Sequence, residues 1–462
     1  MGAGRGYRTE TKRTRGGLES LVTWSPYETD QQGEGENAVG RHALPRGRNG
    51  KFGRSGQRVA VIAVPVVAAM TMTATSASAA SALTPADKAM AGKLNQRVGV
   101  AHLGSNVVGE VRDVVSGQTV WSKNPTKGVM PASTNKLATA VAALTVLGPN
   151  HTVQTKAVYR SGTVYLVGGG DQQLSSADLK SLATAAAKVL KAQGHRSVRL
   201  MFDDHLFAAP SLATGWNSGY YPDTVAPVRA LRIEGNNTQD TALTATKYFA
   251  QQLTAQGVTV GTPARATTPS GTTVVATHTS KPLSTTVEYM LKHSDNDIAE
   301  GLLRLTALGQ GRAATFAGGA AAVHAVLVQY GVPLTGVKEY DGSGLSRSDR
   351  MTADALSAIA GLAVDTRYQA KLWPILKGLP VAGVDGTLST SYGRFTTAPA
   401  SCAVGKVDAK TGTLSDVSAL AGVAKGQDGR WKSFVFVENG TAPTATVTHG
   451  LDGLAATVEG CW

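Results

Sequence analysis

The sequence predicts an α+β fold, within the broad α/β class, in which helices flank an antiparallel sheet and a large insertion interrupts the domain. An Ala/Leu-rich run from Leu137 to Leu147 is typical of a buried helix that ends before Gly148-Pro149. Three strand-like runs follow one another near the C-terminus. About 160 residues separate Ser133 from Ser294, two residues in short polar motifs, and this is more than one connection needs.

The C-terminal strand-like runs are Lys406–Leu414, Val417–Ala424 and Trp431–Val437. The last two are joined by Lys425–Arg430, which is rich in turn residues. This succession predicts a β-meander. The segment Thr444–Glu459, rich in Ala, Thr and Val, is expected to form a helix that closes on the sheet.

Residues 152–283 are expected to form the inserted domain or domains. Within them, short strands are predicted at Thr155–Tyr159, Thr163–Val167 and Thr272–Ala276, and helices at Leu182–Ala192 and Thr244–Leu253. The segment Val167-Gly-Gly-Gly-Asp171 resembles a phosphate-binding loop only superficially. It has neither the G-x-G-x-x-G spacing nor the lysine of a P-loop, so we interpret it as a tight strand end.

The N-terminal residues predict an exported protein. Residues 1–58 hold eleven Lys/Arg against six Asp/Glu and have no apolar periodicity, which is typical of a disordered basic extension. The net charge of +13 is thus partly local, and no nucleic-acid partner is predicted because no binding fold accompanies it. Residues 59–82 contain an apolar run and then Ala77-Ser78-Ala79, which fits a signal-peptide cleavage site.

The expected location is therefore extracytoplasmic, in the cell wall or secreted. The alternative for residues 59–82 is an uncleaved anchor, which would be the only contact with a membrane. The apolar run is short for a stable membrane span and contains Pro65.

The cysteine and histidine content bears on disulfides and metals. Cys402 and Cys461 are the only two cysteines, and in an exported protein such a pair predicts one disulfide. Two free thiols are the alternative. None of the nine histidines has H-E-x-x-H or another metal-ligand spacing, so neither a metal nor another cofactor is expected.

Three motifs stand in a fixed order: Ser133-Thr-Asn-Lys136, Ser294-Asp-Asn296 and Lys410-Thr-Gly-Thr413. S-x-x-K, S-D-N and K-T-G follow in this order in active-site serine enzymes that bind penicillin. Taken singly, Ser133 fits a helix N-cap and Lys410 fits a solvated strand lysine. S-x-N occurs three times and is weak alone, but the joint order favours function.

The motif residues are suited to acyl transfer to serine. Ser133 is expected at a helix N-terminus, and Lys136 lies one turn further on the same face. Desolvation in a helix-lined cleft lowers the pKa of a lysine, which can then accept the serine proton. Gly412 allows a ligand to approach the backbone of the K-T-G strand closely.

Taken together, the chain resembles the low-molecular-mass class C penicillin-binding proteins, which are D-alanyl-D-alanine carboxypeptidases and endopeptidases of peptidase family S13. The resemblance spans about residues 90–460. It is carried by Pro131–Lys136, Leu166–Asp171, Lys292–Asn296, Asp341–Arg347, Val381–Leu388 and Ala409–Leu414. Gln172-Gln173 departs from the Pro-Thr often found there, at a position that is not catalytic.

The resemblance implies a penicillin-binding, serine β-lactamase-like transpeptidase fold, with residues 83–151 and 284–462 as the DD-peptidase domain. It implies that the substrates are peptidoglycan stem peptides ending in D-Ala-D-Ala and that β-lactam antibiotics are inhibitors.

The resemblance also implies a role for each motif residue. Ser133 would be the nucleophile, Lys136 the general base, and Ser294 with Lys410 the proton path to the leaving group. Asn296 would orient Lys136 and the substrate amide. The substrate-binding strand is Lys410, Thr411, Gly412 and Thr413, with the Ser133 and Thr413 N–H groups as the oxyanion hole.

Two other functions remain as alternatives. A β-lactamase needs a second base for rapid hydrolysis of the penicilloyl ester, and no Glu-x-x-Leu-Asn stretch of the class A kind is found. A non-catalytic penicillin-binding or peptidoglycan-sensing protein would have no need of the nucleophile and base that Ser133 and Lys136 provide.

Overall fold

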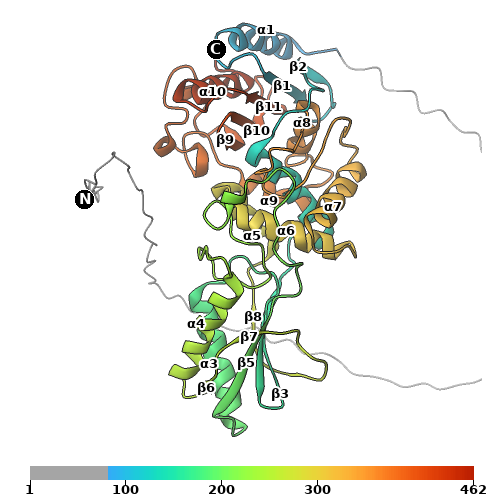
Figure 1. Cartoon of the computed structure of the whole chain (residues 1–462). Coiled ribbons are helices and arrows are strands. Elements are labelled where there is room, and N and C mark those ends of the chain that lie inside the picture. Colours follow the sequence, from blue (N-terminus) through green and yellow to red (C-terminus); the bar gives the residue numbers. More distant parts are fainter. Residues whose placement is uncertain (1–81) are drawn as a thin grey trace, which may run out of the picture. The chain divides into compact units, whose positions relative to one another are not determined.

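The computed structural model describes residues 82–462, which belong to one compact unit (Figure 1). The predictions for the basic extension, and for the signal or anchor segment as far as residue 81, lie outside the described residues. Within 82–462, no helix combines the length and apolarity that a membrane crossing requires.

A five-stranded antiparallel sheet carries the C-terminal meander. Its strands, in spatial order, are β2 (Thr119–Lys123), β1 (Val107–Asp113), β11 (Trp431–Asn439), β10 (Val417–Lys425) and β9 (Val407–Leu414). The last three are the predicted meander, and β9 with the K-T-G motif is an edge strand. The predicted antiparallel sheet with flanking helices is therefore confirmed.

Helices cover both faces of the sheet. Successive side chains along a strand point to opposite faces, and apolar residues on each face pack against helices. Phe434 and Phe436 pack in one core with α1 (Pro85–Val100) and α10 (Ala445–Glu459), the predicted closing helix. Val435 and Val437 point into the other core. The helices of that second core are α2 (Lys136–Leu147), α5 (Leu283–His293), α6 (Asn296–Gly309), α7 (Phe316–Gln329), α8 (Ala353–Gly361) and α9 (Gln369–Gly378).

A second sheet lies entirely between residues 154 and 279, inside the range for which the sequence predicts an insertion. Its strands, in spatial order, are β6 (Thr259–Val260), β5 (Ser197–Asp203), β4 (Thr163–Val167), β3 (Gln154–Arg160) and β8 (Thr273–Thr279), and β7 (Ala264–Arg265) pairs with β5. The helices α3 (Ser176–Ala192) and α4 (Thr241–Ala255) share an apolar core with it. The region therefore has a core of its own.

Short 3-10 turns complete the chain and include the turn that carries Ser133. They are η1 (Ala132–Asn135), η2 (Ser218–Tyr220), η3 (Gly386–Leu388), η4 (Thr390–Tyr392) and η5 (Ala400–Ala403). The Gly-Gly-Gly-Asp segment directly follows the end of β4, which agrees with the expected tight strand end. There the Gly168 N–H donates to Asp203 O, and a Cβ on Gly169 would lie 2.1 Å from the Gln154 carbonyl oxygen.

Candidate active site

Ser133 lies in the turn η1, which runs directly into α2. The helix itself begins at Lys136, so Ser133 precedes it by one turn rather than opening it. The flanking caps are Pro131 and Asn135, and neither makes a side-chain capping bond. The geometry therefore does not support the alternative in which Ser133 serves as an N-cap. Ala132 has a φ of 48°, which is strained for a residue with a Cβ.

Lys136 is fully buried, and its amine lies among three oxygens. Nζ is 2.9 Å from Ser133 Oγ, 2.8 Å from Asn296 Oδ1 and 2.9 Å from the Ser343 carbonyl oxygen. Burial lowers its pKa to about 8, while the carboxylates of Asp341 and Glu300 oppose that shift. The predicted nucleophile and base are thus in contact.

The S-D-N motif forms the junction between α5 and α6. Ser294 is half-buried and has a left-handed backbone (φ 60°), while Asp295 caps α6 by accepting from the Ile298 N–H. Asn296 opens α6, and its Nδ2 donates to the Thr224 carbonyl oxygen at 2.9 Å. This bond from a chain segment within 152–283 fixes the amide so that Oδ1 faces Lys136.

The K-T-G lysine is buried rather than solvated. Lys410 is 0% exposed, and its Nζ donates to the Thr411 carbonyl oxygen at 2.8 Å. Burial, together with the positive charge of Lys136, lowers the pKa of Lys410 well below its ordinary value. The second lysine therefore belongs to the same electrostatic site as the first.

The free edge of β9 points its odd-numbered N–H groups outward. The Ala409 N–H donates to Pro380 O on the side away from β10, and backbone direction repeats every second residue, so the N–H groups of Thr411 and Thr413 share this side. A Cβ on Gly412 would lie 2.8 Å from the Pro131 carbonyl oxygen. Gly412 is therefore required by the approach of the nucleophile turn, a reason the sequence does not reveal.

Sequence reasoning missed two groups that surround the motifs. One is the Ser343 carbonyl oxygen, supplied by the loop 341–346, whose Gly342 and Ser343 N–H groups donate to the carboxylate of Glu300. The other is Thr387, whose hydroxyl lies 2.7 Å from the Thr411 hydroxyl. The Lys292–Asp385 ion pair, at 2.8 Å, holds the loop that carries Thr387. Only the motif segments Asp341–Arg347 and Val381–Leu388 hinted at either group.

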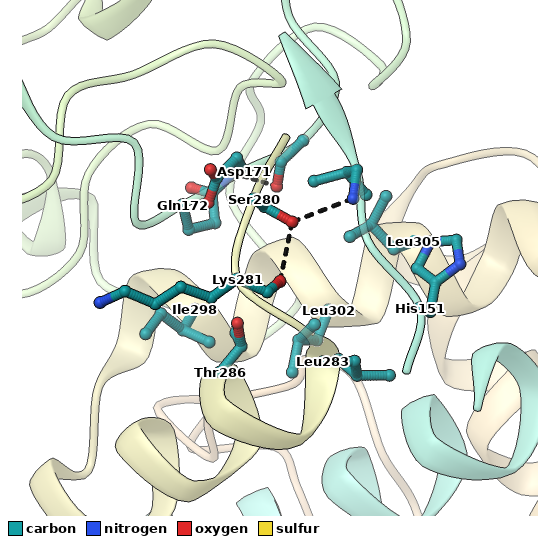
Figure 2. Close-up of a pocket in the computed structure, with 12 residues that line it drawn as sticks. His151, Asp171, Gln172, Ser280, Lys281, Leu283, Thr286, Ile298, Leu302 and Leu305 are labelled. Carbon is teal, nitrogen blue, oxygen red and sulfur yellow. Dashed lines mark hydrogen bonds between the residues drawn. The ribbon is translucent and has the colours of Figure 1, made fainter. Parts of the chain in front are cut away.

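A small, partly open cavity lies elsewhere, where the chain enters and leaves the second sheet (Figure 2). The Val153 N–H donates to Ser280 Oγ and so joins the segment before β3 to the segment after β8, while Ser280 Oγ donates to the Lys281 carbonyl oxygen of its own segment. The α6 residues Ile298 and Leu302 form part of its apolar wall. No residue of the S-x-x-K, S-D-N or K-T-G motifs lines this cavity, so we do not assign the chemistry to it.

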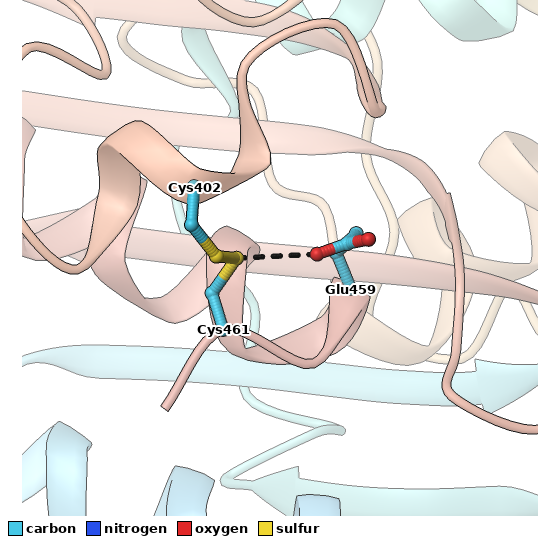
Figure 3. A group of neighbouring side chains, drawn as sticks. All are labelled: Cys402, Glu459 and Cys461. Atoms are coloured by element: carbon cyan, nitrogen blue, oxygen red, sulfur yellow. Dashed lines mark hydrogen bonds between the residues drawn. A yellow bond between two sulfur atoms is a disulfide. The ribbon is translucent and has the colours of Figure 1, made fainter.

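Cys402 and Cys461 form a disulfide in the structure, with their Cα atoms 6.1 Å apart (Figure 3). The bridge joins η5, just before β9, to Cys461, the second residue after α10. Glu459 lies beside the two sulfurs in a group that resembles a metal site. Metal binding by cysteine requires thiolates, and bonded sulfurs provide none, so the group does not fit a metal in this state.

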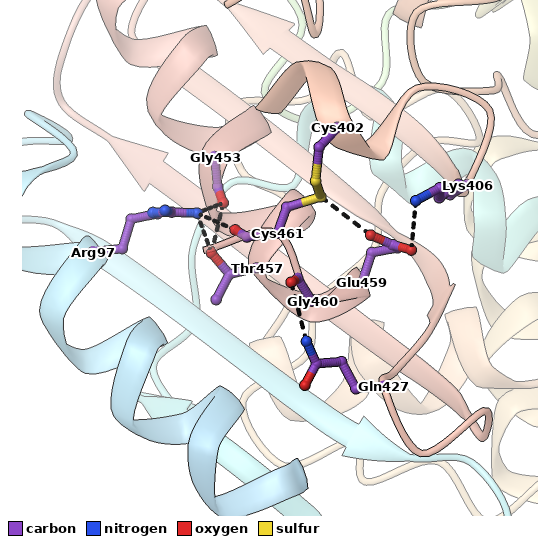
Figure 4. The surroundings of a disulfide bond; sticks show 9 residues. All are labelled: Arg97, Cys402, Lys406, Gln427, Gly453, Thr457, Glu459, Gly460 and Cys461. Carbon is purple, nitrogen blue, oxygen red and sulfur yellow. Dashed lines mark hydrogen bonds and ion pairs between the residues drawn. A yellow bond between two sulfur atoms is a disulfide. The ribbon is translucent and has the colours of Figure 1, made fainter. Parts of the chain in front are cut away.

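Neighbouring residues hold the C-terminal end around this bridge (Figure 4). Arg97 of α1 donates to the carbonyl oxygens of Gly453 and Cys461, and Lys406 pairs with Glu459 at 3.1 Å. The disulfide thus belongs to a set of contacts that fasten α10 between α1 and the start of β9.

A serine and a buried lysine on one turn, an S-D-N junction and a K-T-G edge strand define an active-site serine hydrolase of the penicillin-binding type. A family model described as the D-Ala-D-Ala carboxypeptidase 3 (S13) family matches residues 90–242 and 234–458. The chain therefore belongs to this family. It is a D-Ala-D-Ala carboxypeptidase, and the resemblance inferred from the motifs is confirmed.

Individual relatives agree with this assignment. The chain is 32% identical to Carboxypeptidase DacB of Mycolicibacterium smegmatis, over 82% of this chain and 86% of that protein. It is 29% identical to the D-alanyl-D-alanine carboxypeptidase of an Actinomadura species, over 71% and 77% of the two chains.

The solved structures support the fold. Penicillin binding protein 4 (dacB) of Haemophilus influenzae superimposes with a TM-score of 0.69 at 23% identity, covering 80% of this chain and 99% of that chain. The same Haemophilus protein has also been solved with a β-lactam. That complex has a TM-score of 0.60 at 24% identity, covering 78% of this chain and 98% of that chain.

Proposed function

We propose that this carboxypeptidase works through an acyl-enzyme on Ser133, with Lys136 as general base, and that its substrates are peptidoglycan stem peptides ending in D-Ala-D-Ala. The observation that carries the proposal is the 2.9 Å separation of Lys136 Nζ from Ser133 Oγ in a buried setting. With a pKa of about 8, roughly a tenth of the lysines are neutral at pH 7.

The neighbours of Lys136 direct its lone pair. The Ser343 carbonyl oxygen and Asn296 Oδ1 can only accept hydrogen bonds. A neutral amine therefore donates its two protons to them and turns its lone pair to the Ser133 hydroxyl. Ser133 Oγ–H then gives its proton to Nζ as the oxygen bonds to the carbonyl carbon of the penultimate D-Ala.

The tetrahedral oxyanion would be held by the N–H groups of Ser133 and Thr413. The second is supported by the outward direction of the odd-numbered N–H groups along β9. Loss of one such donor typically costs about 2.7–4 kcal/mol of transition-state stabilisation.

Departure of D-Ala requires that its nitrogen receive a proton as the C–N bond breaks. Ser294 and Lys410 would convey the proton that Lys136 has taken up. The side chains of Lys410, Thr411 and Thr413 would bind the terminal carboxylate, whose negative charge favours the protonated form of Lys410 and offsets the lowering of its pKa. Water then cleaves the ester on Ser133.

The same chemistry explains two further expectations. A cross-linked peptide in place of the terminal D-Ala makes the reaction that of an endopeptidase. A β-lactam presents a strained amide and a carboxylate to the same groups, so we expect penicillin to acylate Ser133. The β-lactam complex of the Haemophilus relative supports this expectation.

We also propose that the protein is exported and acts in the cell wall. The proposal rests on the apolar residues 59–69 followed by Ala77-Ser78-Ala79, and the disulfide supports it because such bonds persist in oxidising compartments. N-terminal sequencing of the protein from the culture fluid and the membrane fraction tests it. Processing near Ala79 supports a signal peptide. Retention of residues 59–79 in membranes supports an anchor, and a cytoplasmic protein contradicts both.

Release of D-Ala from a peptide ending in D-Ala-D-Ala tests the catalytic proposal. We expect release by the native protein, and none above background by a folded Ser133→Ala variant. Ser122→Ala, a change in another S-x-N triplet, is the matched control and should leave the rate unchanged. Equal release by Ser133→Ala and the native protein would refute the assignment.

A further inference from the structure

The general base is oriented by two acceptors, and both depend on helix α6. Asn296 opens the helix and contacts Lys136 directly. Glu300 and Arg304 follow at intervals of four residues, so the three side chains share one face of the helix. Glu300 is 0% exposed and Arg304 is 3% exposed. Glu300 is thus a buried acidic residue on the helix face that also carries Asn296, the partner of Lys136. Its burial there requires a functional explanation.

Glu300 holds the second acceptor through the backbone of a single residue, Ser343. Its Oε1 accepts from the Ser343 N–H at 2.8 Å and from the Gly342 N–H at 3.0 Å. The carbonyl of the same Ser343 accepts from Lys136 Nζ at 2.9 Å. The carboxylate therefore fixes the residue whose oxygen receives a proton of the base amine.

The loop that Glu300 holds lies tightly against the nucleophile turn. Gly344 has a φ of 80°, and a Cβ there would lie 1.9 Å from the Ala132 carbonyl oxygen. The Asp341 carboxylate accepts from the N–H groups of Gly344 and Ser346 and from the Trp216 indole, each within 2.7 Å. A displacement of the loop would thus move the Ser343 oxygen and disturb the turn that holds Ser133.

We propose that Glu300 is a positioning residue for the general base: it aims the Ser343 carbonyl at Lys136 and supplies a negative charge behind it. Its hydrogen bonds go to the backbone of Gly342 and Ser343 rather than to Ser133. The inference deepens the proposed function and rests on Lys136 acting as the base for Ser133.

The charge of Glu300 is part of a defined electrostatic setting. Burial and Asp341 raise the pKa of Glu300 to about 7, so its carboxylate is mostly charged at pH 8, where Lys136 titrates. The charged or titratable groups around Lys136 and Glu300 are Asp295, Asp297 and Arg304 of α6, Asp341 of the loop, Lys410 of β9, Tyr221 and Arg232. The carboxylates favour protonated Lys136, and Lys410 opposes it.

Two variants separate the two parts of the role. Glu300→Gln keeps an acceptor oxygen of nearly the same reach but removes the charge. The pKa of Lys136 should then fall, and the midpoint of acylation against pH should move down by about one unit. Glu300→Asp keeps the charge but shortens the side chain. It should lower the acylation rate constant at least tenfold while the midpoint stays near pH 8.

The experiment measures acylation by a fluorescent penicillin from about pH 6 to about pH 10. It resolves noncovalent binding from the first-order acylation step. Only the acylation step should change, since Glu300 lies behind the base. Glu110→Gln is the matched control: Glu110 is a buried glutamate in β1 that hydrogen-bonds to Thr119 and Arg112, and its loss should leave the midpoint unchanged.

The outcomes distinguish this inference from the proposed function. If native Ser133 is not acylated, the proposed function fails. If native protein is acylated and both Glu300 variants keep its rate constant and pH midpoint, the positioning role alone is overturned. If both variants lose near-ultraviolet dichroism and melt as unfolded chains, Glu300 serves folding, and the positioning role is likewise overturned.

Discussion

At the scale of single residues, the proposed mechanism makes the ionisation of Lys136 the source of the pH dependence. Burial lowers its pKa to about 8, so the reactive neutral amine becomes more abundant as pH rises through that value. Lys410 acts in the opposite sense. In the proposed mechanism its charged form binds the substrate carboxylate, and its pKa is also lowered.

We expect the acylation rate constant to rise with pH and to level off above about pH 8. Lys136→Ala should lower it by about 10²–10⁴-fold, the usual contribution of general-base catalysis. Stopped-flow acylation of both proteins checks this. A variant that keeps nearly the native rate and pH profile would show that another group takes the Ser133 proton.

The sequence predicts side chains near the nucleophile better than backbone groups. The spacing of Ser133 and Lys136 places both on one helical turn, so their contact follows from local geometry. The Ser343 carbonyl is different, because every residue has a carbonyl and its direction depends on the fold of a remote loop. The burial of Lys410 likewise follows from tertiary packing.

At the scale of elements, polar clamps fasten helices to the five-stranded sheet. Lys432 of β11 is 0% exposed and pairs with Asp87 of α1, Asp113 of β1 and Asp428. These partners join the first helix to the centre of the sheet. The disulfide fastens the last helix to the region before β9.

Lys432→Met should destabilise the protein by about 3–5 kcal/mol, because it leaves the buried carboxylate of Asp87 without its cation, whereas Asp113 keeps Arg430. The ion pairs of Lys432 also predict that the stability of the native protein depends on pH. Desolvation raises the pKa values of Asp113 and Asp428, but hydrogen bonds from Lys432 lower both and outweigh it. Ser116 adds to the lowering for Asp113, and the Arg430 N–H adds to it for Asp428. This contribution is present above their unfolded pKa near 3.8 and is lost as pH falls through the lower folded values. Denaturant unfolding at neutral pH and below pH 4 tests both statements; equal stability of variant and native protein would refute them.

Reduction of the disulfide should also lower stability. Closing the segment from Cys402 to Cys461, 59 residues apart, contributes roughly 4 kcal/mol in the chain-entropy model. Thermal unfolding of the native protein, with and without reductant, measures this, and Cys402→Ser/Cys461→Ser without reductant is the control. An unchanged melting temperature on reduction, or free thiols in the non-reduced protein, would contradict the expectation.

Elements with a strong local pattern could be predicted from the sequence. Strands β10 and β11 were recognisable because a turn-rich segment separates two runs of apolar residues. In contrast, β6 and β7 have two residues each and exist only because β5 lies beside them. The helix α1 pairs a capping box with weak apolar periodicity, and tertiary contacts such as those of Arg97 hold it in place.

At the scale of the whole molecule, a segment within 152–283 contributes to the geometry of the proposed active site. Thr224 accepts from the Asn296 amide, the Ala226 N–H donates to Asp297, and Arg232 pairs with Asp297 at 2.7 Å. The sequence indicated a long insertion from the distance between two motifs. It could not indicate that this insertion orients the asparagine of the second motif, because the contact joins residues about seventy positions apart.

The fate of the acyl-enzyme is a property of the complete site. No second base of the Glu-x-x-Leu-Asn kind is found in the sequence, so a bound penicilloyl group should block the approach of water and persist. The D-Ala product leaves and frees that path. We expect slow turnover of penicillin and faster release of D-Ala from a D-Ala-D-Ala peptide. Adduct decay within seconds, with multiple penicillin turnovers, would instead identify a β-lactamase.

The central claim is that Ser133 carries the acyl group. Mass spectrometry of the intact protein after benzylpenicillin, followed by peptide mapping, tests it most directly. We predict one penicilloyl group per chain, located on Ser133, and none on a folded Ser133→Ala variant. An adduct on any other residue, or an unmodified folded protein, would contradict the account.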